Sequence, residues 1–438
     1  MNRSFTWAGL LLVTVAACSE QPVQPAISQA PVQSPLVLQP NGLLCTDSGA
    51  TLSSGALYQV CFNPAHWNRD LIVFIPGYHD PARAPSLPDN LSQTPVSLLF
   101  TALGYGYAST SFRGTGLMQP SSWIGGDLLE LVSTAKTLLY NSTGRTTRYV
   151  YQTGGSQGGL GTVLAVERYP NTFSGGLAGC GPIGDYGKQI AYVGDFRTVF
   201  DYFFKPVIAG WPVWQQNLPM GDPGYINPDS WGTAEQQSGA ALDDPANAGT
   251  IQQVLNVTHA PTDPNDPSTI KATTQGILWY SFRGTNDAIA KLSGSPFDNR
   301  STVYTGSLND AALNAGVARF QWTADPVKLA DLQTSGHLVR PLVTIHTSGD
   351  PIVPIWHEPL YRNKLSFFGK LLESRITIDR YGHCKFTDAE VLGAFAVLVL
   401  KVTGANLLVS SSVLHDERAR AEFLRLAREH GAEPTLAP

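Results

Sequence analysis

The stretch that most limits how this chain can fold is YVYQTGGSQGGLGTV, residues 149–163. A β-rich apolar run leads into five glycines around Ser156, and a run with helical apolar spacing follows. The glycines lack the Lys of a P-loop and the i, i+2, i+5 register of a Rossmann fingerprint. A flexible linker is also a poor interpretation, because a predicted strand leads directly into the glycines and a predicted helix follows them directly. The stretch therefore predicts a G-x-S-x-G nucleophile elbow, Gly154 to Gly158.

The elbow explains why glycine is needed two positions on either side of the serine. The serine of such a turn is strained, with its hydroxyl exposed, and bulkier neighbours would collide with the adjoining strand and helix. Ser156 also stands at the helix N-terminus, where the helix dipole and free N–H groups favour developing negative charge. We therefore predict that Ser156 is a nucleophile.

Apolar runs on both sides of the elbow set the expected fold class. Strands are predicted at residues 71–75 and about 105–111, and within RYVYQTGG, SGGLAGCGP, PLVTIHTSGDP and SRITIDRYGHC. Helices are predicted in DLLELVSTAKTLLY, GGLGTVLAVERYP and VLGAFAVLVLKVTG, and Thr387 with Glu390 forms a capping box before the last. This alternation is typical of an α/β protein with a mostly parallel sheet and helices on both faces.

One long stretch interrupts the alternation. Residues 186–340 lack clear buried strands and are rich first in aromatic residues and then in Asp, Pro and Asn. We expect a mostly helical cap inserted over the sheet, between core segments at 41–185 and 341–412. Residues 413–438 predict a charged amphipathic helix and a frayed end.

The N-terminus predicts export. Arg3 precedes a short apolar run, and VAAC then fits a bacterial lipoprotein cleavage box in which residues 1–17 are the signal peptide and Cys18 is lipidated. The alternative is a plain secretory signal that ends near Ala17. Residues 18–40, rich in Pro, Gln and Ser, are expected to form a tether. The mature protein would be a lipid-anchored envelope protein or secreted, with membrane contact only through the anchor.

Four cysteines remain besides Cys18, an even number in an oxidising compartment. Cys45 and Cys61 flank a predicted hairpin and form the natural local pair. Cys180 with Cys384 would then be the long-range pair. The alternative is that two of the cysteines are buried free thiols.

The order of the predicted strands along the chain indicates which acid and which histidine act with the serine. In a strand–elbow–helix hydrolase, the acid ends a late strand and the histidine follows the last one. Asp350 follows VTIHTSG and His383 follows the next predicted strand, so we assign Ser156, Asp350 and His383 as a triad in which Asp350 orients His383 and His383 takes the serine proton. Asp185 is a rival acid, and Asp379 lies within its strand.

Other residues near the predicted strand ends have expected roles. The flanking His346 and His357 are expected to be structural or to line a pocket. The oxyanion needs backbone donors, which we assign to Gln157 N–H and to Tyr78 N–H in the PGYHDP loop. The alternative for that loop is an ordinary Pro-Gly turn.

With the elbow, the late Asp, the later His and the PGY loop, the chain resembles the α/β-hydrolase superfamily over residues 55–185 and 341–405. Within it, the chain is similar to secreted bacterial esterases and prolyl-oligopeptidase-like serine hydrolases with a large cap, and the PGY loop is similar to that of cutinase-like esterases. Tannase and feruloyl esterase relatives also carry a Cys directly after the catalytic His, as in His383-Cys384, but pair it with a Cys before the serine. Gly155 holds that position here, and Cys180 is a possible substitute.

The resemblance implies an exported serine carboxylesterase for a small-molecule or polymer ester. The alternatives are a serine peptidase with the same triad, which would need acidic cap residues such as Asp195 or Asp201, and a non-catalytic binding protein. The cap aromatics form either a substrate wall or cap core: Tyr186, Tyr192, Phe196, Phe200, Tyr202, Phe203, Phe204, Trp211 and Trp214. A net charge of −5 argues against nucleic acid. The acidic loops lack EF-hand spacing, so no metal or cofactor is expected.

Overall fold

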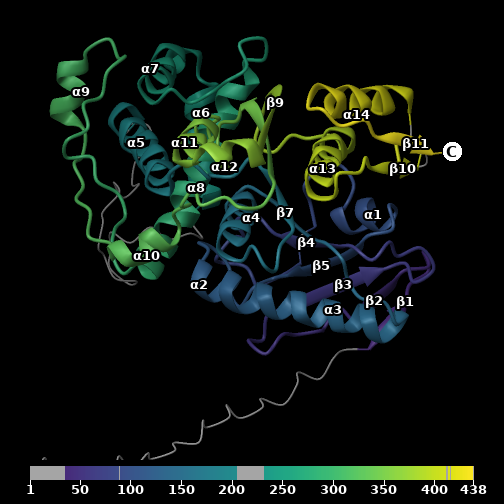
Figure 1. Cartoon of the computed structure of the whole chain (residues 1–438). Coiled ribbons are helices and arrows are strands. Elements are labelled where there is room, and N and C mark those ends of the chain that lie inside the picture. Colours follow the sequence, from purple (N-terminus) through teal and green to yellow (C-terminus); the bar gives the residue numbers. More distant parts are fainter. Residues whose placement is uncertain (1–34, 88, 205–230, 411–412, 415, 438) are drawn as a thin grey trace, which may run out of the picture.

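A nine-stranded sheet forms the centre of the computed structural model, which describes residues 35–87, 89–204, 231–410, 413–414 and 416–437. The strand order is β1-β2-β3-β5-β4-β6-β7-β8-β9 (Figure 1). The strands are β1 (Leu36–Leu38), β2 (Leu44–Thr46), β3 (Tyr58–Phe62), β4 (Leu71–Ile75), β5 (Gly106–Thr110), β6 (Val150–Gly155), β7 (Gly175–Gly179), β8 (Leu342–Gly349) and β9 (Glu373–Tyr381). Pairing is antiparallel from β1 to β5 and parallel from β5 to β9.

Helices cover both faces of this sheet because its central strands are apolar on both sides. Along β4, Leu71, Val73 and Ile75 pack into the cluster that contains α3 and α4, whereas Ile72 and Phe74 pack against α1 and α13. The core helices are α1 (Val96–Thr101), α2 (Pro120–Ser122), the π-helical turn η1 (Trp123–Leu128), α3 (Leu129–Thr143), α4 (Gln157–Arg168), α11 (His357–Lys364), α12 (Phe367–Leu372), α13 (Asp388–Thr403) and α14 (Glu417–Glu429).

The six predicted strands are all present, as β4 to β9, and the mostly parallel α/β fold is confirmed. The capping box also forms: the Thr387 side chain accepts from Glu390 N–H, and the Glu390 carboxylate accepts from Thr387 N–H. The helix predicted from DLLELVSTAKTLLY begins within η1 and continues as α3.

Two expectations near the termini are wrong. Leu36–Leu38 was expected within the tether but forms β1, because the apolar triplet can pair antiparallel with β2 at the sheet edge. The end expected to fray forms β11 (Thr435–Ala437), which pairs in parallel with β10 (Leu408–Ser410). Residues 1–34, with the predicted signal peptide and Cys18, lie outside the described residues.

The insertion is helical in its described parts, 186–204 and 231–340, and has its own apolar core. Its helices are α5 (Tyr186–Phe204), α6 (Trp231–Asp243), the 3-10 turn η3 (Pro245–Asn247), α7 (Ala248–Thr258), α8 (Ser268–Leu292), α9 (Asp310–Gly316) and α10 (Pro326–Asp331). Figure 1 shows α5 to α9 gathered on one side of the sheet, away from α13 and α14. Among the residues that the structure describes, no helix is long and apolar enough to cross a membrane.

Candidate active site

The chain has the α/β-hydrolase fold: a mostly parallel sheet, whose first strands are antiparallel, carries a sharp turn with a serine between β6 and α4. Ser156 has φ 57° and ψ −127°, a backbone conformation that residues other than glycine rarely adopt. A Cβ atom at Gly154 or Gly158 would lie 2.5 or 2.2 Å from the carbonyl oxygen of Ile75. Both flanking glycines are therefore required by the close approach of β4.

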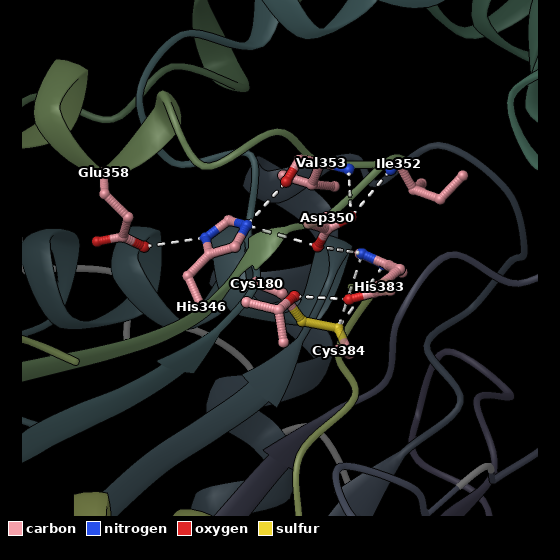
Figure 2. Close-up of a disulfide and its surroundings, with 10 residues drawn as sticks. Cys180, His346, Asp350, Ile352, Val353, Glu358, His383 and Cys384 are labelled. Atoms are coloured by element: carbon pink, nitrogen blue, oxygen red, sulfur yellow. Dashed lines mark hydrogen bonds and ion pairs between the residues drawn. A yellow bond between two sulfur atoms is a disulfide. The ribbon is translucent and has the colours of Figure 1, made fainter. Parts of the chain in front are cut away.

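The acid and the base predicted from the sequence meet after β8 and β9 (Figure 2). His383 Nδ1 lies 2.7 Å from Asp350 Oδ2, and Asp350 Oδ1 accepts from the N–H groups of Ile352 and Val353 at 2.9 and 3.0 Å. Burial alone would raise the pKa of Asp350, but the nearby imidazoles of His383 and His346 hold that pKa well below its usual range. Asp350 is therefore a buried carboxylate, and the ring that it orients is partly open to solvent.

A second histidine supports the same carboxylate from the other side. His346 Nε2 lies 2.7 Å from the Val353 carbonyl and 3.5 Å from Asp350 Oδ2, and its Nδ1 lies 3.1 Å from Glu358 Oε1. Burial alone would lower the pKa of His346, but hydrogen bonds to Asp350 and Glu358 raise it to about 10. Both ring nitrogens face acceptors, so the buried ring is an imidazolium. His346 is thus a structural residue, one of its two expected roles, whereas no feature of the sequence indicates Glu358 as its partner.

This charge state predicts a pH dependence of stability. The folded-state pKa of His346 lies above the unfolded value of about 6.5, so its stabilisation is fully present below that pH and is lost as pH rises through about 10. Between about pH 7 and pH 10, we expect the free energy of unfolding of the natural protein to fall more steeply than that of a His346→Gln variant. Urea unfolding at a series of pH values measures both slopes. Equal slopes would show that His346 is neutral.

The serine and the histidine are brought close through their chain neighbours. A Cβ at Gly155 would lie 3.5 Å from Cys384 Sγ and 3.9 Å from Cys180 Sγ. The disulfide that joins Cys180 to Cys384 therefore packs directly against the residue before Ser156. Among the hydrogen bonds of the described residues, none joins Ser156 Oγ to His383.

The structure contains both disulfides named from the sequence, rather than free thiols. Cys45 and Cys61 face each other across β2 and β3 and are bonded. Cys180, directly after β7, is bonded to Cys384 and so ties the loop of His383 to the sheet. In the described part of the chain, the one group with metal-ligand spacing is Cys180, His383 and Cys384. The two sulfurs form a disulfide, so His383 is the one residue of this group that could still bind a metal.

The residues predicted to supply the oxyanion donors, Tyr78 and Gln157, line the same cavity as the serine. The Gln157 side chain is engaged elsewhere: its Oε1 accepts from Met118 N–H at 2.9 Å and its Nε2 donates to the Gly116 carbonyl at 3.0 Å. Gly77 approaches the elbow so closely that an added Cβ would lie 3.5 Å from Ser156 Cβ. Ser156, Gln157 and Tyr78 all line one cavity.

That cavity has a volume of about 120 Å³ and lies between the elbow and the cap helices α5 and α8. Its wall is mainly apolar and aromatic, and none of the described residues that line it is Asp, Glu, Lys, Arg or His. The lining residues are Tyr78, Leu117, Ser156, Gln157, Pro182, Tyr186, Gln189, Ile190, Val193, Tyr280, Gly284, Thr285, Ala288, Pro296, Ile352 and Val353. Burial raises the pKa of Tyr280 to about 12, so its hydroxyl is protonated at neutral pH.

The other candidate residues, Asp185, Asp379 and His357, have hydrogen-bond partners other than His383. The carboxylate of Asp185 accepts from Lys188 N–H and from Gln333 Nε2, and exposed Asp379 accepts from Ser348 Oγ. His357 is buried and bonds Gln189 Oε1 at 2.9 Å. None of these three joins His383, which leaves Asp350 as its carboxylate partner.

The aromatic residues of the first cap segment divide between the two interpretations. Tyr186 lines the cavity. Six others pack in or against the cap core: Tyr192, Phe196, Phe200, Tyr202, Phe203 and Phe204. Trp211 and Trp214 lie outside the described residues. Cap packing therefore accounts for most of the segment.

No protein-family model and no curated protein matches this sequence. Among solved structures, feruloyl esterase B from Aspergillus oryzae is similar with 14% identity over 86% of each chain and a TM-score of 0.43. The rice cell wall degrading esterase LipA from Xanthomonas oryzae has 12% identity over 78% of this chain and 82% of its own, with a TM-score of 0.36. Acylaminoacyl peptidase from Pyrococcus horikoshii has 12% identity over 75% of this chain and 35% of its own, with a TM-score of 0.35.

Proposed function

We propose that the protein is an exported serine hydrolase that cleaves carboxylic esters through an acyl-enzyme intermediate. The observation that carries the proposal is the strained Ser156 on the wall of an apolar cavity, together with the buried Asp350 that is hydrogen-bonded to His383 in the loop next to the elbow. A serine held for attack explains both the unfavourable backbone of Ser156 and the glycines that permit it.

The proposed chemistry follows from the position of each group. Asp350 holds the His383 Nδ1–H, so Nε2 is free to take the proton of Ser156 Oγ as the oxygen attacks the ester carbonyl. The N–H groups of Gln157 and Tyr78 stabilise the oxyanion. His383 then protonates the leaving alcohol, and a water attacks the acyl group by the same steps. The Ser156–His383 hydrogen bond is expected to form on substrate binding, as is common in serine hydrolases.

The size and the apolar wall of the cavity suit a compact, uncharged acyl or alcohol group of the substrate. An engineered cavity of roughly 150 Å³ in another protein binds benzene, so about 120 Å³ suits a group no larger than one ring or a short alkyl chain. An aminopeptidase would need a carboxylate to bind the substrate ammonium. Asp195 instead bonds Tyr304 Oη at 2.6 Å, and Asp201 bonds the buried Arg197. The ester is therefore favoured over the peptide.

Substrate preference tests this proposal. We expect p-nitrophenyl acetate and butyrate to be hydrolysed with a kcat/KM at least about 100-fold above that for aminoacyl anilides, because the acyl group of these esters carries no ammonium that needs a carboxylate partner. Steady-state assays of the purified protein on both series measure the ratio. Faster anilide turnover would identify a peptidase, and turnover of neither series would favour a binding protein.

The long-range disulfide provides a second prediction. Replacing both Cys180 and Cys384 by alanine should lower the free energy of unfolding by about 2–5 kcal/mol and also reduce ester turnover, since the loop of His383 loses its tie to the sheet. The Cys45→Ala, Cys61→Ala pair is the matched control: it should lower stability with turnover unchanged. Urea unfolding and ester assays measure both effects. Equal turnover in the two variants would contradict a positioning role.

The proposed location is the cell envelope, with Cys18 as the lipid anchor, or the medium if the signal is a plain secretory one. The two disulfides of the structure support an oxidising compartment. The substrate is a small-molecule or polymer ester, and neither nucleic acid nor a cofactor is part of the proposal.

A further inference from the structure

We propose that the cap is part of the catalytic machinery: helix α5 positions the loop of the catalytic acid through Tyr192 and Gln189. This inference rests on the proposed function, because it gives Asp350 its role as the catalytic acid. The loop in question, 350–353, follows β8 and contains Asp350 itself. We call it the acid loop.

Three successive carbonyls of the acid loop each accept a hydrogen bond from a different buried side chain. The carbonyls of residues 351, 352 and 353 accept, in that order, from Tyr192 Oη at 2.7 Å, Gln189 Nε2 at 2.9 Å and His346 Nε2 at 2.7 Å. Two of the three donors come from α5, about 160 residues earlier in the chain, and one comes from β8. The cap therefore supplies most of the side-chain donors that hold this loop.

The inner side of the same loop holds the carboxylate. The N–H groups of Ile352 and Val353 donate to Asp350 Oδ1, while Oδ2 faces His383. A peptide unit that tilts or shifts moves its N–H together with the neighbouring carbonyl, since the unit is planar. The donors on α5 thus fix the position of the oxygen that orients His383.

The orientation of Gln189 is itself fixed. His357 Nδ1 accepts from Gly184 N–H at 3.1 Å, so the ring proton is on Nε2 and is donated to Gln189 Oε1 at 2.9 Å. The amide oxygen is therefore committed to His357, and the NH₂ group must point to Ile352. Burial keeps His357 neutral, since it holds the pKa of this ring well below its usual range.

The arrangement also joins the acid to the substrate cavity. Gln189, Ile352 and Val353 all line that cavity, whereas the buried Tyr192 does not. Tyr192 can therefore be altered without changing the cavity wall. It is a positioning residue, and its hydroxyl is the sharpest point at which to test the cap's contribution.

The test compares Tyr192→Phe with Tyr304→Phe. Both remove one buried cap hydroxyl, but Tyr304 Oη donates to Asp195 and accepts from Asn299, both within the cap, and has no hydrogen bond to the acid loop. For Tyr192→Phe we expect kcat on a short ester to fall roughly tenfold with KM within about twofold, because only the alignment of the acid changes. The control should lose a similar amount of thermal stability and keep its kcat. Equal kcat values in the two variants would overturn the proposal.

Amide hydrogen exchange provides a readout that needs no activity. The amides of residues 352 and 353 should exchange faster in Tyr192→Phe than in the natural protein or the control, because their acceptor Asp350 is less well placed. Gln189→Met, which removes the second cap donor, should do the same and serves if Tyr192→Phe does not fold. Unchanged exchange in the folded variants would contradict the proposal, whether or not the protein hydrolyses esters. If the natural protein hydrolyses no ester but Tyr192→Phe still exchanges faster, the proposed function is overturned and the positioning of the acid loop by α5 is retained.

Discussion

Replacing Ser156 by alanine is expected to lower kcat/KM on short esters by a factor on the order of 10⁴ or more. The reason is that no acyl-enzyme can form without the hydroxyl, and only cavity binding and the oxyanion N–H groups remain. The fold should persist, because the Ser156 hydroxyl has no hydrogen-bond partner among the described residues and a methyl group fits the same space. Ester assays beside a thermal unfolding curve measure both properties.

The control for this substitution is a serine near the site but outside the elbow. Ser348, whose hydroxyl donates to exposed Asp379, suits this purpose. Ser348→Ala should retain ester turnover within about twofold, as expected for a surface substitution. Full turnover in Ser156→Ala would remove this residue from the proposed mechanism.

Replacing Asp350 by asparagine is expected to reduce kcat by roughly 10⁴, a loss comparable to that of the acid in other serine triads. An amide cannot stabilise the His383 imidazolium, and its NH₂ group, if turned to Nδ1, would force the wrong tautomer. The variant should also be less stable, because it removes a negative charge beside the His346 imidazolium.

Two rival carboxylates provide matched controls for the acid. Asp185→Asn and Asp379→Asn make the same chemical change after β7 and within β9, away from His383. Both should keep kcat within a few-fold of the natural protein. If Asp185→Asn or Asp379→Asn loses as much activity as Asp350→Asn, the assignment of the acid is wrong.

Much of the core could be predicted because its signals are local. The glycines of the elbow satisfy a steric need between adjoining elements, and the Thr387–Glu390 capping box needs only residues three positions apart. The order of strands and helices in turn placed Asp350 and His383 at the same edge of a parallel sheet. These features depend on spacing alone, and the structure has them where the spacing indicates.

The parts that could not be predicted depend on long-range contacts. Neither the pairing of Tyr192 and Gln189 with the acid loop nor that of His346 with Glu358 leaves a periodic pattern in the sequence. The division of the aromatic segment into cap core and cavity wall likewise depends on which face of α5 meets α7 and α8. The three-residue strands β1 and β11 are too short to be predicted without knowing their partners.

The central claim is that Ser156 is the activated nucleophile, and covalent labelling tests it most directly. The protein is treated with a fluorophosphonate, and intact-mass and peptide mass spectrometry are applied to the natural chain and to Ser156→Ala. The account predicts one phosphonyl group per natural chain, on Ser156, and none on the variant. A label that persists in Ser156→Ala, or a natural chain that stays unlabelled, would contradict it.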